Sequence, residues 1–381
     1  MPRVKTNLKI CFVATVDSAI TFFLANHLRE LAKLYDLTII TNTNNPALLS
    51  EIRVDANLIQ IKFSRKISLV TDFYCLIKLF QIFMKNRFVS IHSITPKAGL
   101  LAMLAARICF IPTRIHTFTG QVWTTDTGLK RSFLKLLDKL IGKITTHNLV
   151  DSQSQRDFLV KEVVLSPNKS LVFGSGSVAG VDLKKFKSNK RLGNEIRKQL
   201  GIPKDGFVYL FLGRLVEDKG VLDLAKAFSE INNSKIYLVF VGSDEAKLSA
   251  HILNICAHKT KHIRIVGFSK EPYKYIASAN VLCLPSYREG FGSVIIEAAA
   301  MGVPAIASNI YGITDAIQLN KTGLLHEPRD ILGIKVAMES LLHKPLLLNK
   351  LKKAAKRRVI DKFDANKITD HWLKFYSRYV S

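Results

Sequence analysis

The feature that most constrains the fold is an alternation along almost the whole chain. Short apolar runs rich in β-branched residues alternate with helical stretches such as 18–34 and 68–85. Strands separated by crossover helices pair in parallel, so this alternation predicts an α/β fold. The expected strands are 8–15, 37–41, 58–62, 89–93, 114–118 and 145–150 in the first half, and 207–212, 236–241, 263–267, 281–285 and 304–308 in the second.

The length of 381 residues suggests about two domains. A polar, basic stretch at 182–203 separates the two sets of expected strands and is typical of a linker. We therefore expect two Rossmann-like domains facing a central cleft, at 1–185 and 186–365, with a final helix at 366–381 that packs back on the first domain. Ligands of such sheets bind beyond the carboxyl ends of the strands.

The chain carries 56 Lys and Arg against 30 Asp and Glu, a formal net charge of +26. Such an excess, spread over both halves, predicts an anionic partner: a phosphorylated substrate, an acidic membrane surface or nucleic acid. The five cysteines are scattered and form no CxxC pair, which disfavours a disulfide scaffold or a zinc ribbon and fits a reducing cytoplasm.

No uninterrupted apolar run reaches the length of a membrane span, which is roughly 18 residues. The segment 130–143 nevertheless has the pattern of a basic amphipathic helix, and 74–87 is both apolar and basic. Such helices can lie on an anionic bilayer. A helix that packs on the core with a solvated basic side is the alternative for 130–143.

Two glutamates, Glu289 and Glu297, lie eight positions apart in the segment YREGFGSVIIE at 287–297. We expect Glu289 on a loop after a strand and Glu297 in the helix that follows. A carboxylate accepts two hydrogen bonds from a sugar diol, and a helix N-terminus suits a phosphate. The backbone amides at that helix start would come from Gly290, Phe291, Gly292 and Ser293. An exposed helix start with two solvated glutamates is an equal alternative on this pattern alone.

A second loop, GRLVEDKG at 213–220, also follows an expected strand and precedes a helix. After Gly213 it carries Arg214, whose guanidinium can bind a phosphate through two hydrogen bonds, and Lys219, a point charge. In a chain this basic, a surface turn with two solvated cations is the alternative interpretation.

Together the two loops resemble the donor-binding half of the family 4 retaining glycosyltransferases, which have the GT-B fold. The resemblance spans nearly the whole chain and is strongest from 207 to 328, where GR, K, EGFG, E, GxP, GxT and TGLL follow in order. It implies that Glu297 binds the nucleotide ribose, that Glu289 contacts the transferred sugar near its anomeric centre, and that Arg214 and Lys219 hold the donor diphosphate. More weakly, it implies that Gly312 and Thr314 line a neighbouring helix start.

The first half departs from the family pattern. The loop after the first strand, Val16 to Ala19, contains no glycine, and the residue before Gly120 is Thr119 where many members have a histidine. His116 lies three positions earlier and is interpreted more readily as a packed strand residue than as a catalyst. The candidates for the acceptor side are Ser18, His116, Thr119 and Gly120.

The segment HTFTGQVW at 116–123 resembles bacterial enzymes that extend lipid-linked O-antigen or capsule units, often with amino-sugar donors. This implies a nucleotide-sugar donor, UDP-linked by family default, a prenyl-diphosphate-linked saccharide acceptor, and peripheral attachment to the inner face of the cytoplasmic membrane. No DxD pair for a divalent cation occurs in the sequence. We therefore expect no metal and no cofactor: Arg214 and Lys219 would stabilise the leaving diphosphate, and Glu289 is a minority candidate for a nucleophile.

Two other classes of protein remain as alternatives. A basic nucleic-acid-binding protein would use the charge of +26, but no zinc finger, RNP-like strand or helix-turn-helix pattern supports it, and no nucleic acid is expected. A GT-B sugar-nucleotide epimerase or a phosphorylase would share the fold with different chemistry. The segment GSGSVAG at 174–180 lacks the spacing of a dinucleotide fingerprint.

Overall fold

The structure is a computed structural model that describes residues 5–64 and 68–380. The chain forms two compact units. The first combines Met1–Ala179 with Ala365–Ser381, and the second is Gly180–Asp364. The division at Ala179–Gly180 lies a few residues before the boundary expected after residue 185.

The first unit is built on a parallel sheet of seven strands in the order β3-β2-β1-β4-β5-β6-β7. All six expected strands are present, with ends shifted by at most two residues. The seventh strand was not expected, because two residues carry no periodic signal. The strands are β1 (Lys9–Ala14), β2 (Asp36–Thr41), β3 (Asn57–Gln60), β4 (Ser90–Ile94), β5 (Thr113–Phe118), β6 (His147–Val150) and β7 (Ser170–Leu171).

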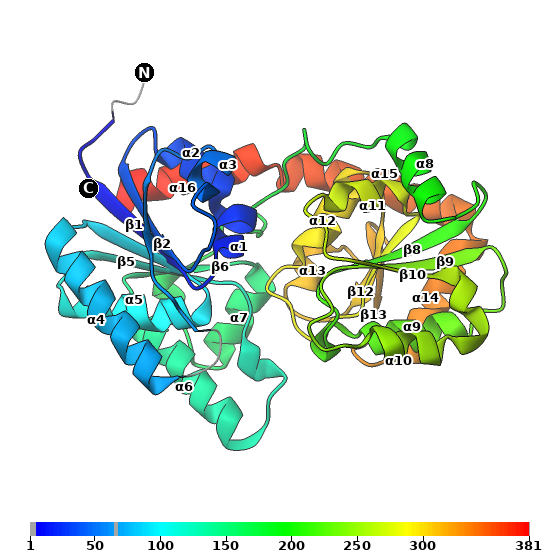
Figure 1. The fold of residues 1–381 in the computed structure, drawn as a ribbon, viewed down its shortest axis with the longest axis horizontal. Helices are drawn as coiled ribbons and strands as arrows, with labels where there is room; N and C mark the ends of the chain where they lie inside the picture. Colours follow the sequence, from blue (N-terminus) through cyan, green and yellow to red (C-terminus); the bar gives the residue numbers. More distant parts are fainter. Residues whose placement is uncertain (1–4, 65–67, 381) are drawn as a thin grey trace. The chain divides into compact units, whose positions relative to one another are not determined.

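Helices cover both faces of this sheet, as Figure 1 shows. Alternate residues of β1 face opposite cores: Ile10 and Phe12 pack toward α2 and α16, and Cys11 and Val13 pack toward α4 and α5. The helices are α1 (Asp17–Ala19), α2 (Ala25–Leu31), α3 (Leu48–Glu51), α4 (Leu69–Asn86), α5 (Pro96–Ile108), α6 (Gly128–Ile144), α7 (Gln153–Lys161) and α16 (Ala365–Tyr379), with short turns of other helix types at Ile20–Leu24, Val122–Thr124 and Pro167–Lys169.

The expected helix at 18–34 is interrupted in the structure. A π-helical turn at Ile20–Leu24 separates α1 from α2. The helix expected at 68–85 is present as α4 with its ends shifted by one residue.

The carboxyl-terminal helix α16 completes the core of the first unit. Ile368, Trp372 and Tyr376 are buried against residues of β1 and α2. His27 of α2 stacks on Trp372 with 4.8 Å between ring centroids, and its Nε2 donates a hydrogen bond of 2.7 Å to the Val178 carbonyl oxygen. A helix at the end of the chain therefore closes a core formed by its beginning.

The second unit has a parallel sheet of six strands in the order β10-β9-β8-β11-β12-β13. The five expected strands are present, and β13 was not expected. The strands are β8 (Phe207–Leu212), β9 (Ile236–Val241), β10 (Ile263–Gly267), β11 (Val281–Leu284), β12 (Ala305–Ser308) and β13 (Gly323–His326).

One apolar core extends through the second unit, from β8 and β9 to α14 and α15. A helix follows each strand of this sheet, as the alternation predicts, and two further helices stand before the first strand and at the end of the unit (Figure 1). The helices are α8 (Lys190–Gln199), α9 (Val221–Ser229), α10 (Ser249–Ile255), α11 (Pro272–Ser278), α12 (Ser293–Ala300), α13 (Ile313–Ala316), α14 (Ile331–His343) and α15 (Pro345–Lys362), with 3₁₀ turns at Glu217–Lys219 and Ala257–His262.

Each sheet reverses its strand order at one point. In the first unit the reversal lies between β1 and β4, and in the second between β8 and β11. The connections leave these neighbouring strands toward opposite sides, which opens a crevice at their carboxyl ends where ligands of such sheets bind. The two loops with candidate donor residues follow β8 and β11.

Candidate active site

The loop after β8 carries Arg214 and ends in the 3₁₀ turn that contains Lys219. Gly220 follows in a left-handed conformation with φ of +65°. A Cβ atom at Gly220 would lie 2.1 Å from the Pro285 carbonyl oxygen. The glycine therefore allows this loop to press against the end of β11, which brings the two candidate loops together.

The loop after β11 leads into α12 through Gly292, which has φ of +73° and precedes the first helical residue, Ser293. Glu289 lies on the loop and Glu297 in the helix, as the sequence favoured. The Phe291 side chain is buried in the core, 5.3 Å from the Phe363 ring between centroids. Phe291 thus offers only its backbone to a ligand, and it anchors the loop at the same time.

Lys219 and Glu289 contact each other directly. The Lys219 Nζ atom lies 2.5 Å from Glu289 Oε1, and the Ser286 hydroxyl donates a 2.9 Å hydrogen bond to the same oxygen. The two side chains are only 18% and 15% exposed. An ion pair of opposite charges thus occupies the strand reversal between β8 and β11, with one partner from each loop.

Arg214 has a different partner. Its Nη1 atom lies 3.0 Å from Oε2 of Glu245, on the loop after β9, and both side chains are substantially exposed. Arg214 and Lys219 share a loop, but the structure records no direct contact of Arg214 with Glu289 or Glu297. Glu245 was not expected from the sequence; its position after a strand was the available signal.

A second ion pair holds the two loops together. Arg288 Nη2 lies 2.6 Å from Asp218 Oδ2, and the Tyr287 amide donates a 2.8 Å hydrogen bond to the Asp218 carbonyl oxygen. The Tyr287 hydroxyl also donates to Asp223 of α9 at 2.6 Å. Neither Asp218 nor Arg288 was named from the sequence, because a contact between two loops 70 residues apart has no local pattern.

Glu297 lies in an environment that favours its neutral form. Burial raises the pKa of this carboxyl group to about 7, and the nearby cation of Lys185 opposes the rise. The ionised form of this carboxyl group, which prevails above pH 7, can accept hydrogen bonds from two hydroxyl groups.

Gly312 lies against the peptide that links Gly290 to Phe291. Its φ is +83°, and a Cβ atom there would lie 2.4 Å from the Gly290 carbonyl oxygen. Thr314, two residues on, belongs to α13, and its amide donates to the Ile310 carbonyl oxygen at 3.2 Å. The backbone at Gly312 thus supports the Glu289 loop from the side of β12.

In the first unit, His116 lies in the interior of β5 and is 2% exposed. Its Nδ1 atom lies 2.8 Å from the Ser93 hydroxyl, and its ring meets Phe118 edge to face. Burial lowers its pKa to about 3. The structure therefore does not bring His116 to the strand ends, in agreement with the interpretation as a packed residue.

The other acceptor-side candidates lie just beyond strand ends. Thr119 and Gly120 follow β5 and are partly exposed, and Ser18 lies in α1, after β1. The adjacent Asp17 accepts a 2.7 Å hydrogen bond from Thr43, on the loop after β2.

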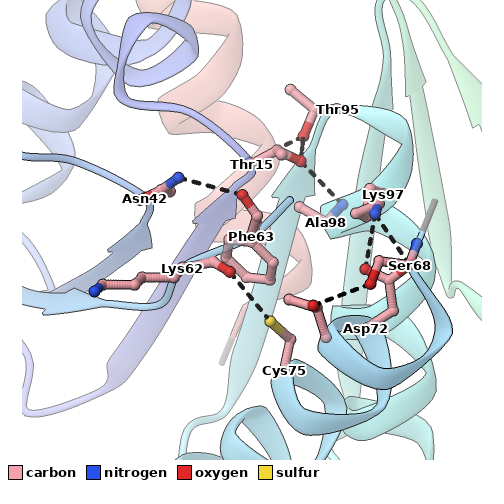
Figure 2. A network of polar contacts seen from close by, with 11 residues as sticks. Thr15, Asn42, Lys62, Phe63, Ser68, Asp72, Cys75, Thr95, Lys97 and Ala98 are labelled. Atoms are coloured by element: carbon pink, nitrogen blue, oxygen red, sulfur yellow. Dashed lines mark hydrogen bonds and ion pairs between the residues drawn. The ribbon is translucent and has the colours of Figure 1, made fainter. Parts of the chain in front are cut away.

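Residues at the β1–β4 reversal were missed by the sequence analysis. The Thr15 and Thr95 hydroxyls lie 2.8 Å apart, one beyond each strand (Figure 2). Thr95 has φ of +82°, which is rare for a residue with a side chain. Lys97, in the first turn of α5, forms a largely buried 2.7 Å ion pair with Asp72 of α4. The segment TPKAG at 95–99 has no pattern typical of a binding site.

Within 5–64 and 68–380, no group of three or more His, Cys, Asp or Glu side chains could hold a metal ion. The positive charges at the β8–β11 reversal come instead from Arg214, Lys219 and Arg288.

Comparison with known families adds an independent line of evidence. The profile of the group 1 glycosyl transferases matches residues 193–358, and the profile described as glycosyl transferase 4-like matches residues 9–148. The two matches fall in the second and first structural units, respectively.

Two relatives match most of the chain. The capsular polysaccharide biosynthesis glycosyltransferase CapM of Staphylococcus aureus is 30% identical over 324 residues, which are 84% of each chain. The UDP-Gal:alpha-D-GlcNAc-diphosphoundecaprenol alpha-1,3-galactosyltransferase of Escherichia coli is 28% identical over 315 residues, 80% of this chain and 79% of its own.

Among solved structures, Anabaena HepE in complex with UDP-glucose has a similar fold. The TM-score is 0.83 at 15% identity, with 98% of this chain and 100% of that chain covered. This likeness establishes the GT-B fold, and the 30% identity to CapM over most of both chains establishes the family. The chain is therefore a glycosyltransferase and belongs to the group 1 glycosyl transferases, with a glycosyl transferase 4-like first unit.

Proposed function

We propose that this glycosyltransferase moves a hexose or N-acetylhexosamine from a UDP-linked donor to a saccharide carried on a prenyl diphosphate, in the synthesis of a bacterial surface polysaccharide. The observation that carries the donor assignment is the Lys219–Glu289 pair at the β8–β11 reversal. A cation for a diphosphate and a carboxylate for sugar hydroxyls stand side by side there. The activity of one relative supports the acceptor: the Escherichia coli enzyme adds galactose to a diphosphoundecaprenol-linked sugar.

The donor would be held by residues of three elements. Arg214 and Lys219 would bind the diphosphate, exchanging their present carboxylate partners, Glu245 and Glu289, for phosphate oxygens. Glu297 would accept hydrogen bonds from the ribose. Glu289 would contact the transferred sugar, while the start of α12 at Ser293 would direct its amides at the anion.

The reaction we propose breaks the bond between the anomeric carbon and the diphosphate oxygen. The acceptor hydroxyl attacks the same face of the sugar and loses its proton, which the departing phosphate can take, so the anomeric configuration is retained. Arg214 and Lys219 would stabilise the negative charge on the leaving diphosphate, each by on the order of 3 kcal/mol. Because these two side chains supply the compensating positive charge, we propose that the transfer needs no divalent metal.

The acceptor side belongs to the first unit in this proposal. Thr119, Gly120 and Ser18 lie beyond strand ends, and Lys97 supplies a cation at the β1–β4 reversal. A prenyl-diphosphate acceptor is anchored in a membrane, so we propose that the enzyme works at the inner face of the cytoplasmic membrane.

A thermal-shift titration tests the donor assignment. UDP, GDP, ADP and their common sugars are added with EDTA present, to the natural enzyme, to Arg214→Ala and to a control, Arg191→Ala. Arg191 is an exposed arginine of α8 that also pairs with a carboxylate, Glu195. A ligand at about 100 times its dissociation constant adds roughly 2.7 kcal/mol of stability.

We expect stabilisation by uridine compounds in the natural enzyme and in the control, with a loss of about tenfold or more in affinity for Arg214→Ala. Transfer to a prenyl-diphosphate saccharide in EDTA, with the product anomer read by NMR, tests the reaction. No stabilisation by any nucleotide would overturn the donor site, and an inverted product or a strict metal requirement would overturn the mechanism.

A further inference from the structure

Helix α4 of the first unit is apolar on two sides. Cys75, Leu79 and Phe83 face the core, four residues apart. A second row points away from the protein: Phe73 is 64% exposed, and large apolar residues recur three or four positions apart along it. The exposed members are Leu69, Val70, Phe73, Tyr74, Ile77, Phe80 and Met84. In a helix of a globular protein the apolar residues normally lie on the side that faces the core, so a second apolar row facing outward is unusual.

Helix α6 carries a second exposed row. Leu129, which is 91% exposed, is followed by Phe133, Leu136 and Leu140 at the same helical spacing. Ile141 and Gly142 lie on the buried side of the helix. Two helices 41 residues or more apart in sequence thus both leave apolar rows uncovered.

The two rows belong to one surface. Helix α5 packs against α4 on one side and α6 on the other, and all three cover the same face of the first sheet (Figure 1). We call the exposed sides of α4 and α6 the α4–α6 face. It holds eleven large exposed apolar residues, whereas exposed apolar residues on a protein surface are usually scattered singly.

The charged residues of this surface are mostly positive. Helices α4, α5 and α6 contain nine Lys and Arg and only two acids, Asp72 and Asp138. Asp138 is buried beneath Trp123, and Asp72 is largely buried in its pair with Lys97. The exposed cations include Lys78, Lys85, Arg87, Lys139 and Lys143. An acidic partner with an apolar interior matches both properties of the face.

We propose that the α4–α6 face inserts its apolar rows into the surface of an anionic lipid bilayer, with the flanking lysines and arginines at the level of the lipid phosphates. Amphipathic helices lie in the bilayer interface in this way, and each cation near an anionic surface contributes about 1 kcal/mol. None of the helices in the described part of the chain has the length and apolarity to cross a membrane. A second copy of the chain is a poorer partner, because pairing this face with itself would bring like charges together.

One end of this surface lies at the carboxyl ends of the strands, where a ligand is expected. Because α4 and α6 begin there, Leu69, Val70 and Leu129 lie near the carboxyl ends of the strands. One turn further along α4, Asp72 holds Lys97 beside the β1–β4 reversal (Figure 2). The inference thus deepens the proposed function, on whose lipid-linked acceptor it rests: the lipid would stay in the bilayer while its diphosphate reaches the strand ends.

Tryptophan fluorescence tests the insertion. The two natural tryptophans, Trp123 and Trp372, are fully buried and give a constant background. Phe73→Trp places an indole on the α4–α6 face. Leu346→Trp is the matched control, an apolar residue of α15 in the second unit that is 85% exposed. Each variant is mixed with vesicles of phosphatidylcholine alone or with phosphatidylglycerol added, with and without brominated acyl chains.

We expect a blue shift and quenching by brominated lipid for Phe73→Trp with phosphatidylglycerol vesicles only, and neither for Leu346→Trp. In flotation, Phe73→Ser with Ile77→Ser should lose tenfold or more of its vesicle partition. The proposal would be overturned if the two tryptophan variants behaved equally or if the serine variant floated with the vesicles as well as the natural protein does. It would also be overturned if the natural protein were a dimer and the serine variant a monomer, since the face would then bind a second copy. Transfer to a short-chain, water-soluble acceptor should be unaffected by the serine substitutions, and failure of that transfer in the natural enzyme would count against the proposed function instead.

Discussion

Single residues around the two candidate donor loops have little freedom to change, and Gly312, on the loop after β12, illustrates this. Gly312 and Gly302 both have positive φ, +83° and +79°. Only Gly312 has backbone within reach of an added Cβ atom; around Gly302 nothing lies within 4 Å. The backbone conformation alone makes alanine unfavourable at both sites by about 1 kcal/mol.

We therefore predict that Gly312→Ala weakens nucleotide-sugar binding, because its Cβ displaces the Gly290–Phe291 peptide next to Glu289, while Gly302→Ala only lowers the melting temperature modestly. Calorimetric titration with the nucleotide sugar, alongside thermal melts, separates the two effects. Equal donor affinity in both variants would mean that the Gly312 contact does not shape the site.

Glu297 should reveal its position through pH. Burial raises its pKa to about 7, so the folded state favours the neutral acid, and ionisation costs stability as the pH rises from the ordinary carboxyl range through 7. We predict that Glu297→Gln raises the melting temperature at pH 8 and changes it little at pH 5.

The same substitution should weaken binding of the donor. A carboxylate can accept hydrogen bonds from both ribose hydroxyls through its two oxygens, whereas a glutamine side chain has only one acceptor oxygen. KM for the nucleotide sugar should rise in the natural enzyme as the pH falls through 7, and this dependence should be absent from Glu297→Gln. A variant that keeps the natural pH profile would show that another group titrates.

At the scale of elements, α16 is held by two buried histidines. His27 and His92 each stack on the Trp372 ring, at 4.8 and 5.0 Å between centroids. Burial lowers the pKa of His27 to about 4 and that of His92 well below its ordinary value. Both rings are therefore neutral in the folded state at neutral pH.

We predict that acid loosens α16. The unfolded state binds protons at these histidines from about pH 6.5 downward and the folded state does not, so stability is lost as the pH falls from 6.5 toward 4. For His27 the loss is on the order of 3 kcal/mol. Hydrogen exchange should show α16 amides opening at pH 5 before those of α14, and uniform protection of both helices would contradict this.

The sequence patterns predict some strands and helices correctly and miss others. The apolar runs predicted β8 and β9 with correct ends, because those strands are almost entirely buried. The edge strand β10 was also predicted with correct ends, although most of its residues are only partly buried. The short strands β7 and β13 were missed, and the π-helical turn at Ile20–Leu24 has no distinguishing composition. Such short elements are stabilised by their neighbours rather than by their own residues, so a local pattern is absent.

At the scale of the whole molecule, the two units differ in how the chain forms them. The second unit is continuous and has its own core, and its ends meet: the Val181 amide donates to the Phe363 carbonyl oxygen at 2.7 Å. The first unit needs residues from both ends of the chain, since Trp372 and Tyr376 complete its core.

We predict that a fragment of residues 180–364 folds alone and binds the uridine nucleotide with an affinity close to that of the full chain. A fragment of residues 1–179 should remain unfolded until 365–381 is fused to it. Circular dichroism and nucleotide titration of the three fragments give the answer, and a folded 1–179 fragment would show that α16 is dispensable.

The sequence by itself determined the α/β class, most strand positions and the loops that carry Arg214, Lys219, Glu289 and Glu297, because periodicity and strand-to-helix transitions are local. Only the tertiary structure decided which of these residues touch. In the structure Lys219 pairs with Glu289, Arg288 pairs with Asp218, and Arg214 pairs with Glu245. It also joined the apolar rows of α4 and α6 into one face and enclosed His116. These outcomes depend on strand order and helix packing, which bring together residues far apart in the chain, and no local pattern encodes such contacts.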